Sequence, residues 1–370
     1  MTYLDYSATT PVNDEVLDTF VKCSKEFIGN PNSLHKLGVE SKKIIDAATS
    51  QIENLLNLKD KEIIYTSGSS ESNNLAIKGI ALKYQNRGKH IITTPLEHSS
   101  IYGPISFLQN LGFEVDFVKL DENGQVDLNN LKELMRDDTI LVSIASVNSE
   151  IGIMQPIDEI GKFLKNYPKC FFHSDFTQSM GKTSISLENV DLVSFSSHKF
   201  YGLKGIGVLL KSNNIKLEPI IHGGKSTSIY RSGTPALPLI VSLSKALRLS
   251  LNELDKKYKR VDKLNKELVK FLSEYDISIN HNEYCIPHML NISLKGIKPE
   301  TFLHALEESE IYISTQSACS TSSSSRAVQA FTNDVEKAKS SIRISLSYLT
   351  TDDEIEFFKQ KFDECIKRLG

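Results

Sequence analysis

The sequence predicts an α/β protein with a mostly parallel sheet covered by helices, together with a smaller C-terminal α/β domain. Up to Lys211, short runs that are apolar on both faces alternate with helical patterns, as in parallel sheets buried between helix layers. A long amphipathic segment then begins at Ile240, and strand and helix patterns resume behind it. A chain of 370 residues is also too long for one small core, which favours two domains.

The strands predicted for the first domain are short runs of β-branched, aromatic and other apolar residues. They cover residues 61–66, 89–94, 113–120, 139–147, 169–175, 191–197 and 205–211. Helical patterns lie between several of them, such as Asn73 to Tyr84 behind the turn "SGSSES" and "DEIGKFLKNY" at 158–167. Strands that alternate with helices in this way are expected to run mostly parallel.

The second domain follows a change of pattern. Between Ile240 and Phe271, apolar residues recur every three or four positions, so this stretch is one long helix or two helices end to end. Strands are predicted near 288–294 and 341–349, and the polyserine "STSSSS" at 320–325 predicts a mobile loop. We expect a large domain over 12–255, and a small domain formed by 1–11 and 256–370.

Charge and cysteine content exclude several classes of protein. A formal net charge of -3 gives no electrostatic reason to bind nucleic acid unaided. The N-terminus "MTYLDYSATT" lacks the features of a signal peptide, and no apolar run reaches the roughly 18 residues of a membrane span. Five cysteines without a C-x-x-C pair argue against a disulfide framework and a structural zinc site. We therefore expect a cytoplasmic protein.

Polar residues follow the ends of several predicted strands. The turn "TSGSSES" opens a helix and could hold a phosphate on its backbone N–H groups, although alone it reads more simply as a serine-rich cap. The other polar residues at strand ends are His98, Asn148, Asp175, Gln178, Ser196, His198 and Lys199. Taken singly, each has a structural explanation, such as a buried histidine, an N-cap or a surface lysine.

One cofactor needs such a set together. Pyridoxal phosphate (PLP) requires a phosphate anchor, a lysine for the Schiff base, a carboxylate on its pyridine nitrogen and a stacking partner. The strand ends offer the serine-rich turn, Lys199, Asp175 and His98. Because ligands of parallel α/β sheets sit at the carboxyl ends of the strands, we expect these groups to meet there.

A series of motifs along nearly the whole chain resembles the cysteine desulfurases, class V members of the fold-type I PLP-dependent enzymes. These motifs are "YLDYSATTPV", "GNPNSLH", "TSGSSESNNLAIKG", "VNSEIG", "DFTQSMGK", "SFSSHKFYGLKGIG", "RSGT", "SAC" and "SSIRISL", in that order. The resemblance implies the fold-type I PLP-transferase fold. It also implies removal of sulfur from L-cysteine, which gives L-alanine and a persulfide on Cys319.

The resemblance assigns roles around the cofactor. Lys199 would form the Schiff base, Asp175 would pair with the pyridinium nitrogen and Gln178 would bond to the phenolic oxygen. His98 would stack on the ring and move protons at the substrate. The phosphate would be held by Ser69, Ser70, Ser196 and His198, and by Thr234 of the neighbouring subunit. The last contact implies a homodimer.

The resemblance also assigns the substrate contacts. Arg343, with Asn148, would bind the substrate carboxylate. In "SIRISL" the arginine alternates with Ile342 and Ile344, so it leaves the apolar face and can offer a bidentate fork to a carboxylate. The Cys319 thiolate would accept the sulfur, because the thiolate is the nucleophilic form of cysteine.

Three positions depart from the family pattern. Phe176 stands where a small residue usually lies against the cofactor, so we expect altered ring packing and a possible effect on rate. Gln316 replaces a small residue before Cys319, and polyserine follows that cysteine. Ser69 and Ser70 stand where the family usually has a small residue and then threonine, so a hydroxyl is kept at the second position.

Several alternatives stay open. One is another class V enzyme, such as a selenocysteine lyase or an aminotransferase, and "SAC" around Cys319 speaks against a plain aminotransferase. A non-catalytic scaffold is the other, and the joint presence of Lys199, Asp175 and His98 speaks against it. Segments such as "YISTQSACST" and "FYGLKG" resemble a Firmicutes branch that supplies sulfur for tRNA 4-thiouridine. A thiouridine-synthesis enzyme is therefore the expected sulfur acceptor, with an iron–sulfur cluster scaffold as the alternative.

Overall fold

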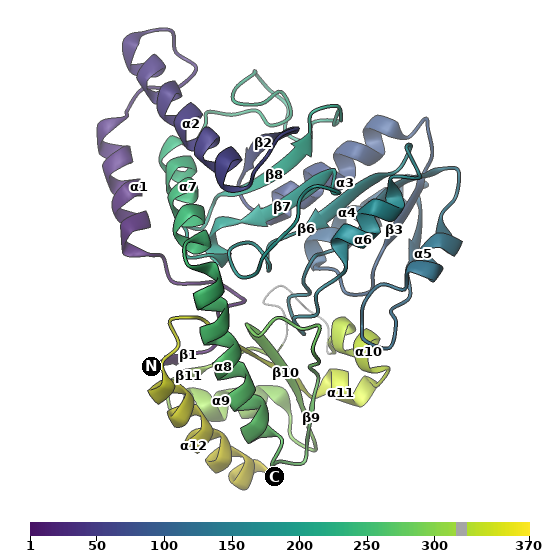
Figure 1. The fold of residues 1–370 in the computed structure, drawn as a ribbon, viewed down its shortest axis with the longest axis vertical. Helices are drawn as coiled ribbons and strands as arrows, with labels where there is room; N and C mark the ends of the chain where they lie inside the picture. The colour runs from purple at the N-terminus through teal and green to yellow at the C-terminus, as the bar shows by residue number, and fades with distance from the viewer. Residues whose placement is uncertain (316–323) are drawn as a thin grey trace.

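The computed structural model describes residues 1–315 and 324–370, which form an upper and a lower part in Figure 1. The larger part holds a seven-stranded sheet with the strand order β2-β8-β7-β6-β5-β3-β4. Its strands are β2 (Lys61–Thr66), β3 (His90–Thr93), β4 (Glu114–Phe117), β5 (Thr139–Ser143), β6 (Phe171–Asp175), β7 (Leu192–Ser196) and β8 (Gly207–Ser212). All seven coincide with predicted strands, although β4 and β5 are shorter than expected.

The prediction of a mostly parallel sheet is confirmed, with one exception. Strands β3 to β7 pair in parallel, whereas β8 runs antiparallel to both of its neighbours, β2 and β7. Only residues 197–206 connect β7 to β8, and a parallel crossover needs a longer connection, usually with an α-helix. The short link therefore imposes the antiparallel direction.

Helices cover both faces of this sheet. On one face, α3 (Ser69–Tyr84) and α4 (Ser99–Gln109) bury their apolar side chains against the strands. On the other face lie α2 (Lys36–Leu55), α5 (Leu128–Leu134), α6 (Ile157–Leu164) and α7 (Leu237–Leu251). Helix α1 (Asp14–Glu26) packs on α7, as Figure 1 shows.

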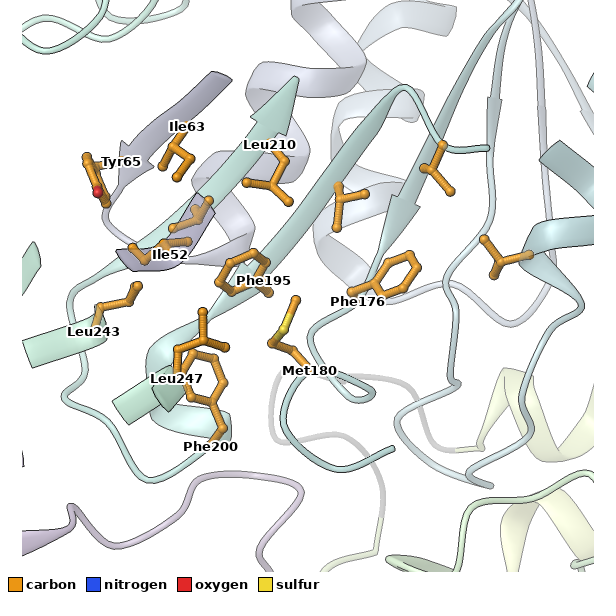
Figure 2. Packing of buried hydrophobic residues seen from close by; sticks show 14 of the residues in the cluster. Ile52, Ile63, Tyr65, Phe176, Met180, Phe195, Phe200, Leu210, Leu243 and Leu247 are labelled. Carbon is orange, nitrogen blue, oxygen red and sulfur yellow. The ribbon is translucent and has the colours of Figure 1, made fainter. Parts of the chain in front are cut away.

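The apolar cluster between the sheet and α7 corrects one expectation. Phe176 is only 2% exposed and belongs to this cluster. Figure 2 shows its ring among other core side chains, including Met180 and Phe195. Phe176 thus follows the Asp175 strand end but packs into the core, and we correct the expectation that it lies against a cofactor.

The smaller part has its own core. An antiparallel sheet in the order β12-β10-β9 contains β9 (Ile277–Ile279), β10 (Met289–Leu294) and β12 (Ser341–Ser345). The N-terminal β1 (Thr2–Tyr3) pairs in parallel with β11 (Ile311–Tyr312). The helices are α8 (Leu254–Leu272), α9 (Pro299–Glu307), α10 (Arg326–Thr332), α11 (Val335–Lys339) and α12 (Asp352–Leu369). The two ends of the chain therefore fold together.

The long amphipathic stretch is two helices. Helix α7 ends at Leu251 and α8 begins at Leu254, and between them Glu253 adopts a left-handed conformation with φ of 53°. Figure 1 shows α7 in the upper part and α8 running on into the lower part. The division at residues 255 and 256 stays a prediction, and this break lies close to it. Of the helices in the described ranges, none combines the length and apolar character that a bilayer crossing needs.

Candidate active site

A cavity of about 170 Å³ lies at the carboxyl ends of the parallel strands. Its lining brings together most of the residues predicted to form the site. These are Ser69, Ser70, His98, Asn148, Asp175, Gln178, His198, Lys199 and Arg343. Ser196 lies beside the cavity and bonds to Ser69, whereas Thr234 is exposed and does not border it. Cys319 lies outside the described residues.

The serine-rich turn begins a helix that faces the cavity. Helix α3 starts at Ser69, whose N–H donates to Ser196 Oγ at 2.7 Å across the end of β7. The turn can lie this close to β8 because residue 207 is glycine: a Cβ there would stand 2.6 Å from Gly68 Cα. The N-terminus of a 16-residue helix, with two serine hydroxyls beside it, provides donors suited to a phosphate.

A chain of hydrogen bonds connects Asp175 to His98. Asp175 Oδ2 accepts a bond from Asn73 Nδ2 at 2.8 Å, and the same amide nitrogen donates to Ser100 Oγ at 2.9 Å. Ser100 Oγ in turn lies 2.8 Å from His98 Nδ1. Sequence reasoning missed Asn73 and Ser100. Asn73 could have been found, because it lies four residues after Ser69 and so shares its helix face.

His98 caps the next helix and is held in one orientation. Its Nδ1 accepts the backbone N–H of Ser100 at 3.2 Å, so the proton of the neutral ring belongs on Nε2. Burial lowers the pKa of His98; the charge of Asp175 opposes this shift and that of Lys199 adds to it. The imidazole at the cavity wall is therefore neutral near pH 7.

Lys199 lies in a short 3₁₀ turn that follows β7. Its Nζ donates to the backbone oxygens of Ser7 and Ala8, each at 2.7 Å. His198 beside it bonds through Nδ1 to Thr9 Oγ1 at 3.1 Å. Burial, followed by the charges of nearby lysines, lowers the pKa of His198 to about 4. The N-terminal motif "SATT" therefore forms one wall of the cavity.

The two predicted substrate residues border the cavity but already have protein partners. Arg343, 1% exposed on β12, pairs with Asp5 Oδ1 at 2.7 Å and donates to Ser149 O at 2.8 Å. The Asn148 side chain donates to Leu96 O at 2.7 Å and accepts two backbone N–H groups. Their role in binding a substrate carboxylate stays a prediction.

The donor set fits PLP. Lys199 supplies an amine and Asp175 supplies a buried carboxyl group. The start of α3, which also lines the cavity, supplies a phosphate cradle. Two buried hydroxyl oxygens that border the cavity, Ser7 Oγ and Thr177 Oγ1, have no hydrogen-bond partner within residues 1–315 and 324–370. Buried polar atoms without partners favour a polar ligand in this space.

The Glu97 side chain holds the loop that follows β5. Its carboxyl group accepts the Ala145 N–H at 3.0 and 3.1 Å and the Thr94 hydroxyl at 2.7 Å. Burial raises the pKa of Glu97 to about 8, against 4.5 when exposed, so it is protonated in the folded protein at pH 7. The unfolded chain releases this proton at lower pH, and Glu97 therefore makes folding less favourable as pH rises from about 4.5 to 8.

We predict that Glu97→Gln removes this pH dependence. Between pH 5 and pH 8.5, the free energy of unfolding should fall by a few kcal/mol more in the wild type than in the variant. Guanidinium unfolding of the cofactor-free protein, followed by circular dichroism, measures this difference. Glu122→Gln, at an exposed position, is the control. If the free energy of unfolding changes with pH equally in Glu97→Gln and in wild type, Glu97 is already ionised in the folded protein and the prediction is wrong.

Comparison with known proteins identifies the family. Residues 2–358 match the family model described as aminotransferase class-V. The chain is 38% identical to the cysteine desulfurase IscS of Dictyoglomus turgidum, over 99% of this chain and 95% of that protein. A solved NifS-like protein superposes with a TM-score of 0.94 at 34% identity, with full coverage of both chains. A structure described as SspA in complex with cysteine superposes with a TM-score of 0.83 at 31% identity, covering 95% of this chain and 100% of that one. The chain therefore belongs to the class-V aminotransferase family and, within it, to the cysteine desulfurases, which have the fold-type I architecture.

Proposed function

We propose that this cysteine desulfurase binds PLP in the strand-end cavity through Lys199 and transfers the sulfur of L-cysteine to Cys319. The observation that carries the proposal is the convergence of Lys199, Asp175 and His98 on one cavity whose wall includes the start of α3. An amine, a carboxyl group, a neutral imidazole and an anion site are the groups that PLP chemistry requires.

The residues divide the work by position. When bound, PLP supplies an electron sink that makes the α-proton of an amino acid acidic. Asp175 would keep a proton on the pyridine nitrogen, and Gln178 would bond to the phenolic oxygen. Lys199 would leave the carbonyl oxygens of Ser7 and Ala8 to hold the cofactor.

The phosphate and substrate groups would occupy the remaining walls. Ser69, Ser70, Ser196 and His198 would hold the phosphate at the start of α3. Neutral His98, with its proton on Nε2, would move a proton at the substrate. Arg343 would bind the substrate carboxylate if that carboxylate replaces or joins Asp5 as its partner.

The sulfur step needs a thiolate. Cys319 Sγ would attack the sulfur of the bound substrate, so that the S–S bond forms as the Cβ–S bond breaks. The persulfide stays on the enzyme, and the carbon skeleton takes up a proton and leaves as L-alanine. The four described cysteines are buried, and burial raises the pKa of each, that of Cys285 to about 11. Their unreactive state supports Cys319 as the acceptor.

We predict that Cys319→Ser separates cofactor binding from sulfur transfer. The variant should still turn yellow with PLP and still change its absorption when L-cysteine is added. Alanine release should nearly vanish, because a serine hydroxyl is a poor nucleophile toward sulfur at neutral pH. Lys199→Ala should lose the visible absorption of the attached cofactor, and the matched control Cys285→Ala should keep turnover. Alanine release from Cys319→Ser at the wild-type rate would rule out the mechanism.

A second proposal concerns assembly: Thr234 completes the phosphate site of a partner subunit in a homodimer. Thr234 is exposed and away from the cavity of its own chain, which leaves it accessible to another chain. Thr234→Ala should weaken PLP binding several-fold while the dimer persists, and the exposed Thr301→Ala is the control. PLP titration of the cofactor-free protein, with light scattering for mass, measures both. A monomer that keeps full PLP affinity would contradict the shared site.

The sulfur acceptor that we propose is a tRNA 4-thiouridine synthesis enzyme. A net charge of -3 suits this assignment, because the partner would hold the tRNA. Deleting the gene should lower 4-thiouridine in bulk tRNA, as measured by mass spectrometry of nucleosides. Unchanged thiouridine together with reduced iron–sulfur enzyme activity would favour a cluster scaffold as the acceptor.

A further inference from the structure

A second lysine, Lys182, is buried directly behind the cavity. It is 7% exposed and lies in the motif "DFTQSMGK", one residue after Gly181. Gly181 has φ of +71°, and a Cβ there would stand 2.8 Å from Ser250 Cβ and 3.0 Å from Phe200 Cβ. Glycine thus permits a tight turn, which brings the Lys182 side chain back under the site.

The side chain of Lys182 has one hydrogen-bond partner among the described residues, and this partner lines the cavity. Its Nζ donates to Gln178 Oε1 at 2.6 Å. Gln178 Nε2 donates at 3.0 Å to Ser7 O, the same carbonyl that accepts Lys199 Nζ. The contacts therefore run from Lys182 through Gln178 and Ser7 to Lys199.

The surroundings of Lys182 do not suit an ammonium ion. Within residues 1–315 and 324–370, no carboxylate lies within ion-pair distance of it, and the charged groups near it are Lys199 and Arg343. His288 also faces it, and burial followed by the charge of Lys182 lowers the pKa of His288 to about 3. Burial, then the two cationic neighbours, place the pKa of Lys182 well below its usual value.

The bonds from Lys182 and to the Ser7 carbonyl together set which way the Gln178 amide faces. The two ends of a glutamine amide have the same shape, and only hydrogen bonds distinguish oxygen from nitrogen. A donor at Lys182 takes the oxygen, and the NH₂ group is left for the side of Ser7 and the cavity. Without that donor, the amide could rotate and present its oxygen there.

We propose that Lys182 is a positioning residue that orients Gln178 so that the amide offers its NH₂ group to the phenolic oxygen of PLP. The inference rests on the proposed function, since it concerns the same site. A donor on this oxygen stabilises its anionic form and so favours loss of the proton that titrates on the nitrogen of Lys199. Loss of Lys182 therefore raises the pH at which the bound cofactor gives up that proton.

The experiment is a pH titration of the visible absorption of PLP-loaded protein. Lys182→Met should raise the midpoint by about one pH unit relative to wild type. In a Gln178→Ala background, the same substitution should leave the midpoint unchanged, because the effect passes through the amide. Lys182→Gln keeps a donor without a charge, so its shift should be smaller. Lys182→Leu, which also lacks a donor, replaces Lys182→Met in the cycle if the methionine variant does not fold.

Lys211→Met is the matched control. Lys211 is fully buried, but its Nζ donates to Ser212 O and Ile215 O on the far side of β8. This variant should lower stability without moving the midpoint. An unchanged midpoint in Lys182→Met would reduce Lys182 to a structural role and overturn the inference. An equal shift in both Gln178 backgrounds would also overturn it, in favour of a direct charge effect. A wild-type protein that takes up no PLP would instead overturn the proposed function.

Discussion

The N-terminal segment around Ser7 and Ala8 lies between the two parts of the molecule at the cavity, where its backbone oxygens accept Lys199 Nζ. The same segment is fixed on its other side by β12 of the smaller part, where Ser7 N–H donates to Ser345 Oγ at 3.0 Å. Asp5 in the same segment pairs with Arg343. The wall of the cavity thus depends on a short N-terminal segment that offers a carboxylate to the buried Arg343 of the smaller part and carbonyl oxygens to Lys199 of the larger part, since an unpaired buried charge is costly.

Burial gives this site its electrostatic character. It lowers the pKa of His98 and His198 and raises that of Glu97, so three ionisable groups around one cavity are neutral near pH 7. Neutral groups cost less to bury, and they leave the start of α3, Lys199 and Arg343 as the features that attract an anion. A phosphate-bearing ligand therefore meets oriented donors in a site with little competing charge.

The ends of the segment that contains Cys319 are attached close to the cavity. On its N-terminal side, Ser314 exchanges backbone hydrogen bonds with Arg343 at 2.6 and 3.1 Å. On its C-terminal side, Ser325 caps α10 and its hydroxyl donates to Glu150, two residues beyond Asn148.

The sequence alone determined the strand and helix order, the family, and the candidates Lys199 and Asp175. The hydrophobic pattern is local, so it predicts each strand from the sequence. Because the carboxyl ends of parallel strands meet at one edge of the sheet, polar residues that follow the strands can be expected to lie together. Tertiary structure decided the antiparallel direction of β8, the core position of Phe176, and the bonds that Asn73 and Lys182 make. These features depend on which way a side chain points. They also depend on contacts with residues that are distant in the chain or are brought close by a tight turn. Hydrophobic periodicity specifies a buried face, but it does not specify which polar group a buried donor will find there.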